Sequence, residues 1–287
     1  MLGKLIKHEW KGTCRVGGLM LILIAGVTFF GWLAFQTPMW QALSNDSSYS
    51  GMSSLDILSM VTLMLYVFML VGTTYGMIIY LGVHFYKTMY TDEGYLTHTL
   101  PVTKHRLLTS KILISGIWYM IVSAAVILSV MILMFSLLSA VMPDDGWSMF
   151  WREITENWDE VVEIMQTELG ITIAKWFAII IFSLLVGPFC TVIILFGAIS
   201  IGQLFTRHRV LMAIVSYIGI MVLSMIISSA IQSAASMNII AQGVQETVAL
   251  DRYMNATILT GLVQNVVLSV ILYIVSYFVI NNKLNME

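Results

Sequence analysis

The stretch that decides the fold runs from Trp176 to Leu204 and reads WFAIIIFSLLVGPFCTVIILFGAISIGQL, without a single Asp, Glu, Lys or Arg. An α-helix needs about 20 apolar residues to cross the hydrocarbon core of a bilayer, at about 1.5 Å per residue. Five more runs of this kind lie along the chain, at 16–35, 57–85, 112–141, 210–231 and 256–280. The sequence therefore predicts an all-α polytopic membrane protein with six transmembrane helices.

The composition agrees with this assignment and limits what else the chain can contain. Hydrophobic residues make up 59% and charged residues only 10%, whereas soluble domains carry about 25% charged residues. The longest stretch outside the apolar runs, 142–175, is too short to fold as an independent domain. We therefore expect one membrane domain over residues 1–287, with any catalytic domain on a separate chain.

The charged residues between the runs predict the orientation, because Lys and Arg close to a span resist translocation. Segments 1–15, 86–111, 205–209 and 281–287 hold 11 of the 14 Lys and Arg and only four acidic residues. The three opposite segments hold twelve acidic residues and three basic ones. We therefore predict a cell-membrane protein whose N- and C-termini are both cytoplasmic.

Two segments outside the runs are amphipathic at helical spacing. In residues 2–11 the apolar side chains occupy one face and Lys4, Lys7 and Lys11 lie on the other, which predicts an N-terminal interfacial helix. In residues 147–169 an aromatic and aliphatic stripe is separated from six acidic side chains. This second pattern predicts an external helix that rests its apolar side on the membrane.

No motif for bond chemistry occurs in the sequence. It contains no G-x-x-x-x-G-K-[ST] loop, no H-E-x-x-H and no G-x-S-x-G. The five histidines all fall near the predicted cytoplasmic boundary: His8, His84, His98, His105 and His208. We therefore expect no enzyme, no cofactor, no metal site and no nucleic-acid partner.

The apolar runs also lack the acidic or basic side chains that ion-coupled transporters place inside the bilayer. If the protein moves a solute uphill, its energy must come from outside the membrane domain. Three polar or irregular positions do lie within the runs. Pro188 predicts a kink, and Gln264 and Asn265 predict either packing between helices or a substrate path.

The segment from Tyr90 to Lys111 joins the second and third runs on the basic side. Thr103 is a good N-cap for a helix that starts at Lys104, with Val102 and Leu107 spaced as a hydrophobic staple. The sequence therefore predicts a short, basic, membrane-parallel helix that projects from the inner face.

This segment resembles the membrane permease subunits of the type 2 class of ATP-binding-cassette (ABC) exporters. Members carry an acidic-Glu-Gly segment, a Leu-Pro-[Val or Ile]-[Ser or Thr] turn, a basic cluster and a Leu-rich start of the next span. The matching residues here are Asp92-Glu93-Gly94, Leu100-Pro101-Val102-Thr103, Lys104-His105-Arg106 and Leu107-Leu108. The amphipathic N-terminus, the six spans and the inward termini also fit this family.

The resemblance implies that this segment is a coupling helix that docks on a separate ATPase subunit, and that two permeases work as a pair, as either a homodimer or a heterodimer. The residues it assigns to coupling are Asp92, Glu93, Gly94, Pro101, Thr103, Lys104, His105 and Arg106. Arg207 and Arg209 would form a second, smaller contact. The alternative is a membrane scaffold or sensor subunit that binds a partner without transport; a secondary transporter or channel is disfavoured by the charge-free runs.

Overall fold

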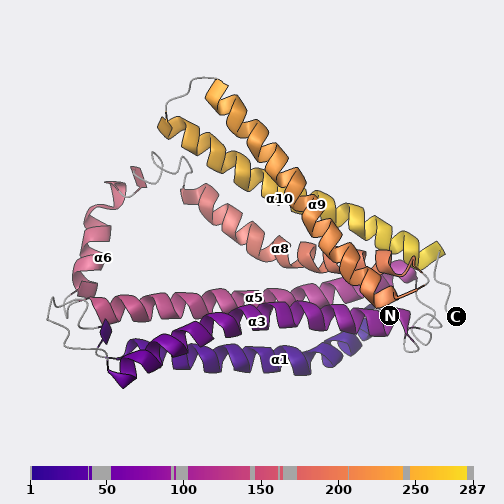
Figure 1. The fold of residues 1–287 in the computed structure, drawn as a ribbon, viewed down its shortest axis with the longest axis horizontal. Helices are drawn as coiled ribbons and strands as arrows, with labels where there is room; N and C mark the ends of the chain where they lie inside the picture. Colours follow the sequence, from indigo (N-terminus) through magenta and orange to yellow (C-terminus); the bar gives the residue numbers. More distant parts are fainter. Residues whose placement is uncertain are drawn as a thin grey trace. The chain divides into compact units, whose positions relative to one another are not determined.

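The protein is described by a computed structural model over residues 2–37, 39–40, 53–91, 94, 103–142, 146–160, 162–163, 173–205, 207–241 and 246–282. Its elements in these ranges are helices (Figure 1): α1 (Leu2–Phe35), α3 (Ser54–Tyr90), α5 (Lys104–Val141), α6 (Gly146–Glu156), α8 (Ile173–Gly202), α9 (Arg209–Ala241) and α10 (Glu246–Asn282). All except α6 are long and apolar enough to cross a membrane. The prediction of an all-α polytopic membrane protein with six spanning helices is thus confirmed.

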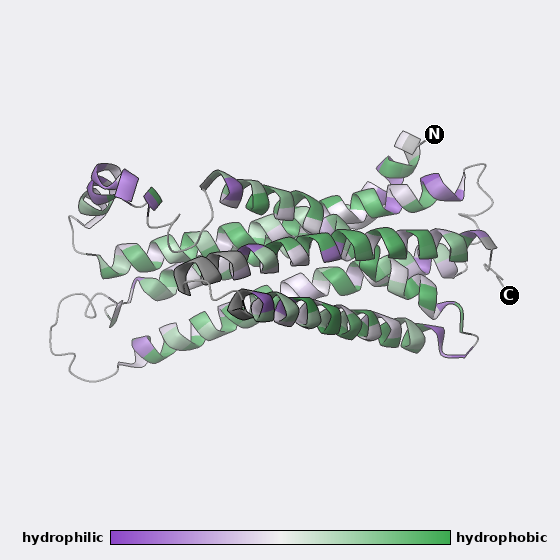
Figure 2. Ribbon diagram, turned by 90° about the horizontal axis from the view of Figure 1, so that it is seen from above, coloured by the Kyte–Doolittle hydropathy of each residue, from purple (hydrophilic) through white to green (hydrophobic). Residues whose placement is uncertain are grey.

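Hydrophobic residues make up most of the length of the long helices, and hydrophilic residues gather near the helix ends (Figure 2). Five of the six predicted apolar runs lie wholly within one helix each, and these helices extend beyond the runs; the run 176–204 instead continues two residues past the end of α8 at Gly202. The largest difference is between the fifth and sixth apolar runs: α9 continues to Ala241 and α10 already begins at Glu246, so both helices extend well beyond their runs. Ser, Ala and Met prevail after Ile231 and sustain a helix, and the single glycine there, Gly243, falls between the two helices.

Two predicted short helices are parts of longer ones. Residues 2–11, predicted as an interfacial helix, form the first turns of α1 without a break before the first apolar run. Lys104 begins a helix as Thr103 predicts, yet that helix is α5 itself, which continues to Val141. No glycine or proline lies between Lys104 and Ile114, so nothing in the sequence separates the predicted short basic helix from the third span. The basic residues at the start of α5 therefore extend the third spanning helix along its own axis.

The chain divides into two compact units. Unit 1 comprises Met1–Lys11, Ile78–Met120 and Asp159–Glu287, and unit 2 comprises Gly12–Met77 and Ile121–Trp158. Helices α1, α3 and α5 each contribute residues to both units.

In unit 1, helix α8 packs against both α9 and α10, and α9 also packs against α10 (Figure 1). The core between α3 and α8 contains a stacked pair of rings, Phe85 and Phe196, with centroids 3.8 Å apart and both side chains buried. Pro188 lies inside α8, which bends along its length in Figure 1. The hydroxyl of Thr191 donates a hydrogen bond to the carbonyl of Gly187 (3.0 Å), next to the proline that cannot donate.

Helices α8 and α9 approach each other closely at Gly202. A Cβ atom added there would lie 2.5 Å from Cα of Ala213 and 2.6 Å from its amide nitrogen, so no side chain fits without moving backbone. We expect Gly202→Ala to destabilise the protein by about 1–3 kcal/mol in thermal unfolding. The matched control is Gly219→Ala in α9, where the added Cβ would meet nothing within 4 Å; this variant should be neutral or slightly stabilising.

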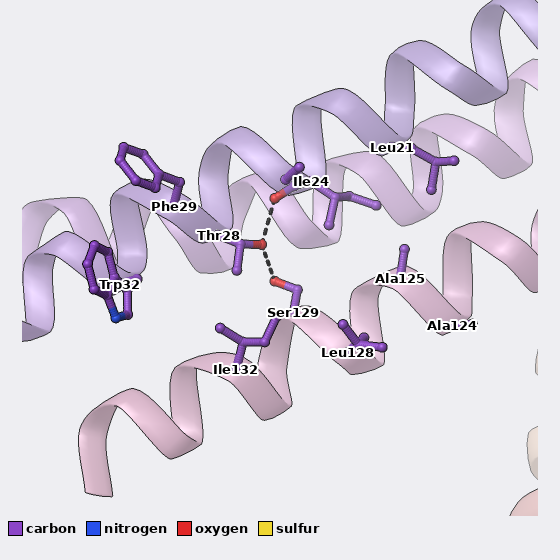
Figure 3. A pocket seen from close by; sticks show the side chains of 11 residues that line it. Leu21, Ile24, Thr28, Phe29, Trp32, Ala124, Ala125, Leu128, Ser129 and Ile132 are labelled. Carbon is purple, nitrogen blue, oxygen red and sulfur yellow. Dashed lines mark hydrogen bonds between the residues drawn. The ribbon is translucent and has the colours of Figure 1, made fainter. Parts of the chain in front are cut away.

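Unit 2 is held by a buried chain of hydroxyl groups. The Thr28 hydroxyl donates to the carbonyl of Ile24 (2.6 Å) and lies 2.6 Å from the hydroxyl of Ser129, which is itself 2.8 Å from the Tyr66 hydroxyl. Figure 3 shows Thr28 and Ser129 meeting at the edge of an apolar pocket between α1 and α5. These bonds join α1, α3 and α5 and satisfy the polar groups that lie among apolar side chains.

The acidic segment 147–169, predicted as one helix, is interrupted in the structure. Helix α6 ends at Glu156, Asn157 is in a turn, and helical residues resume at Trp158. The carboxylates of Glu156 and Glu160 would be i,i+4 neighbours in an unbroken helix, where like charges repel each other. This repulsion favours the break at Asn157; residues 164–169 of the predicted helix lie outside the described residues.

Candidate functional site at the basic end of unit 1

The predicted coupling residues lie around the end of α3 and the start of α5. Three of them, Asp92, Glu93 and Pro101, lie outside the described residues. The amide of Gly94 donates to the carbonyl of Thr91 (2.7 Å), and a Cβ atom on Gly94 would lie 2.6 Å from the carbonyl atoms of Met89. The turn after α3 therefore accepts only glycine at this position of the acidic-Glu-Gly motif.

Lys104 and His105 are engaged by α10. The ammonium group of Lys104 donates to the carbonyls of Ile280 (3.0 Å) and Asn281 (3.2 Å) in the last turn of α10. A cation there satisfies carbonyls that have no partner within the helix and complements the helix dipole. Nδ1 of His105 lies 2.6 Å from the hydroxyl of Tyr273. Two of the predicted coupling residues thus fasten the start of α5 to the end of α10.

The arginines at this end differ from those two residues. Arg106 and Arg207 are exposed, and Arg209 is partly buried as the first residue of α9. His208 connects the last two with a φ of 55°, in the left-handed region that few residues other than glycine adopt. Of the predicted coupling cations in the described residues, the arginines are therefore the ones that present charge at the surface without a role in holding helices together.

A buried cluster of charged residues lies close by and was not predicted as a site. One carboxylate oxygen of Glu9 lies 2.5 Å from the ammonium group of Lys111, and the other lies 3.2 Å from Nε2 of His84. Lys111 also donates to the hydroxyl of Thr88 (2.8 Å). The exposed fractions of the side chains are 3% for Lys111, 12% for Glu9 and 23% for His84.

This cluster joins three helices. Glu9 comes from α1, His84 and Thr88 from α3, and Lys111 from α5. Next to Glu9, the ring of Trp10 packs on that of Trp118 with centroids 5.0 Å apart. The pairing provides a compensating charge for each buried ion, and no group of three or more potential metal ligands occurs among the described residues. The cluster therefore serves to hold the N-terminal turns of α1 against α3 and α5.

The sequence carried a weak signal of this cluster. Glu9 is the only acidic residue before Asp46, among four basic residues, and Lys111 adjoins the third apolar run. Both were counted as charges of the basic side, and neither position indicates by itself that the two side chains meet.

The amides in the sixth span have different surroundings. Nε2 of Gln264 donates to the carbonyl (2.6 Å) and the hydroxyl (2.8 Å) of Ser224, linking α10 to α9. Asn265 donates to the carbonyl of Gly261 in its own helix (3.0 Å). Packing between helices accounts for Gln264, and Asn265 satisfies its amide locally. Neither contact provides evidence for a substrate path.

Comparisons of this chain with protein families, with curated proteins and with solved structures found no match. The function is therefore inferred from the residues and their arrangement.

Proposed function

We propose that this chain is the transmembrane permease subunit of an ABC exporter, that it pairs with a second permease, and that a separate ATPase subunit drives it. In this proposal the basic end faces the cytoplasm of a cell. The observation that carries it is the motif between the second and third spans, from Asp92-Glu93-Gly94 to Lys104-His105-Arg106. This motif lies at the end of the spans that collects most of the Lys and Arg.

The contacts of Lys104 and His105 support a role of this segment in coupling. Because these side chains bind the end of α10, a displacement of the first turn of α5 would move two spanning helices of unit 1 together. Arg106 lies between Thr103 and the buried Leu107 and remains exposed for a partner. Closure of the paired ATPase would act as a ligand with different affinities for two states of the permease, which is what a conformational shift requires.

The absence of Asp, Glu, Lys and Arg from the apolar runs supports an external source of energy. The paired charges of Glu9 and Lys111 lie outside these runs. In this proposal the permease forms the translocation path and the ATPase supplies the energy, so the permease itself catalyses no bond chemistry.

Co-expression with the ATPase encoded in a neighbouring reading frame tests the proposal. We expect a purified complex with two copies of each subunit, and ATP hydrolysis that changes when the permease is reconstituted in lipid nanodiscs. The chain alone in proteoliposomes should not accumulate solute in response to a proton or sodium gradient. A neighbouring ATPase that fails to form a complex, or ion-driven uptake by the chain alone, would overturn the proposal.

A further inference from the structure

A surface pocket of about 540 Å³ opens at the start of α9 in unit 1. It is lined by Tyr86 from α3, by His208 and Arg209 from the turn that begins α9, and by Val210, Leu211 and Ile214. The lining therefore combines a cationic end at His208 and Arg209 with an apolar wall of three side chains from the first turns of α9.

The cationic end has no side-chain partner within the part of the chain that the structure describes. No hydrogen bond or ion pair joins His208 or Arg209 to a side chain anywhere in the described ranges, although the carbonyl of His208 accepts the amide of Met212 (2.9 Å). The cations near it behave differently, because Lys104 binds carbonyls of α10 and Lys111 binds Glu9. Arg209 is thus a partly buried guanidinium whose donors remain available.

The backbone holds this end in place at some cost. His208 adopts a φ of 55°, and residues other than glycine keep such a conformation only where the surrounding structure requires it. The turn places His208 and Arg209 together at the pocket beside Tyr86. The strained turn and the free guanidinium therefore occur at the same place.

The apolar wall belongs to a spanning helix. Val210, Leu211 and Ile214 are 54%, 56% and 57% exposed, and they lie in the first turns of a helix that is long and apolar enough to cross a membrane. Their exposed surface faces hydrocarbon rather than water in a bilayer. A ligand that fills the whole pocket must then carry an anionic head and an apolar chain in the same molecule.

We propose that this pocket binds one anionic phospholipid, with its phosphate at Arg209 and His208 and its acyl chain along Val210, Leu211 and Ile214. A guanidinium can donate two parallel hydrogen bonds to a phosphate. Anionic lipids are enriched in the leaflet that faces the cytoplasm, where the charge distribution of this chain predicts its basic end to lie.

The basic and the apolar residues line one and the same pocket, which favours a lipid over a soluble phosphate or a docked ATPase as its occupant. A soluble phosphate would use only the polar end and leave the apolar wall unfilled. A docked ATPase would contact Arg207, which is exposed toward solvent, but it would not reach apolar side chains that lie at the depth of the acyl chains. In this proposal the pocket lies at the boundary between head groups and hydrocarbon, where a phospholipid has both its anionic and its apolar part.

Native mass spectrometry of the full chain in a neutral detergent tests the proposal, with phosphatidylglycerol and phosphatidylcholine as probes. The wild-type chain should bind one phosphatidylglycerol more tightly than phosphatidylcholine. Arg209→Gln should weaken phosphatidylglycerol binding about fivefold, as expected for one cation at a lipid head group, and leave phosphatidylcholine unchanged. Arg209→Lys should retain most of the preference, because the charge is kept.

Lys87→Gln is the matched control, because Lys87 is an exposed cation next to Tyr86 that does not line the pocket. It should bind both lipids as the wild type does.

Equal effects of Arg209→Gln and Lys87→Gln would overturn the proposal, as would equal binding of the two lipids. Displacement of phosphatidylglycerol by glycerol 3-phosphate at the same concentration would show a simple anion site instead. If Arg209→Gln does not fold, His208→Gln provides the same comparison. The measurement uses no ATPase, so its outcome is independent of the proposed transport function.

Discussion

Lys111→Met is expected to destabilise the protein by about 3 kcal/mol, since removal of one partner of a buried ion pair typically costs about 3–5 kcal/mol. The variant keeps the length and apolar stem of the side chain but leaves the carboxylate of Glu9 without its closest cation. His84 remains 3.2 Å from the other carboxylate oxygen and retains part of the compensation, which places the expected loss at the lower end of the range. Thermal unfolding in detergent, followed by circular dichroism, measures this loss.

The double variant Glu9→Gln with Lys111→Met separates the effect of an unpaired buried charge on stability from the effect of changed side-chain packing. It contains no buried unpaired charge at these two positions, so it should recover most of the stability lost in Lys111→Met. Lys87→Met is the control, because Lys87 is exposed and its replacement should change stability by less than about 0.5 kcal/mol. Equal stabilities of Lys111→Met and Lys87→Met would show that the pair of Glu9 and Lys111 does not hold these helices together.

The spanning helices could be predicted because each is encoded by a local property of the sequence. An uninterrupted run such as 176–204 has only one way to satisfy its backbone in a bilayer, which is to form a helix. The ends of the helices were less predictable. Helices α9 and α10 extend beyond their apolar runs through residues that favour a helix without being strongly apolar, so hydropathy alone does not locate the ends of these two helices.

The site depends on contacts that no local pattern contains. Lys104 and Lys111 look alike in the sequence as cations before a span, yet one caps α10 and the other is buried against Glu9. The difference depends on which helices lie next to α5, and residues 176 positions apart must meet for Lys104 to reach Ile280. Thr103 was predicted correctly as the residue before a helix, because an N-cap is a local feature.

Under the proposed function, Arg106→Glu is expected to weaken the binding of this chain to the proposed ATPase on the order of 30-fold and to abolish stimulation of ATP hydrolysis. In the proposed function Arg106 is the exposed cation of the coupling segment, and reversal of a charge at a docking surface replaces an attraction by a repulsion. No described contact ties Arg106 to α10, so the unfolding temperature of the variant should equal that of the wild type. Affinity is measured by surface-immobilised binding of the ATPase to permease in nanodiscs.

Lys104→Glu distinguishes the transmission of movement to α10 from the binding of the proposed ATPase, because Lys104 holds the end of α10. This variant should lower the unfolding temperature as well as the coupled hydrolysis, whereas Arg106→Glu should affect coupling alone. Arg152→Glu is the control for charge reversal: Arg152 is exposed on α6, in a segment that the charge distribution predicts to be external, and the variant should bind the ATPase as the wild type does. An unchanged complex and unchanged hydrolysis in Arg106→Glu would favour the scaffold or sensor alternative, since a subunit that transmits no force has no need of this cation.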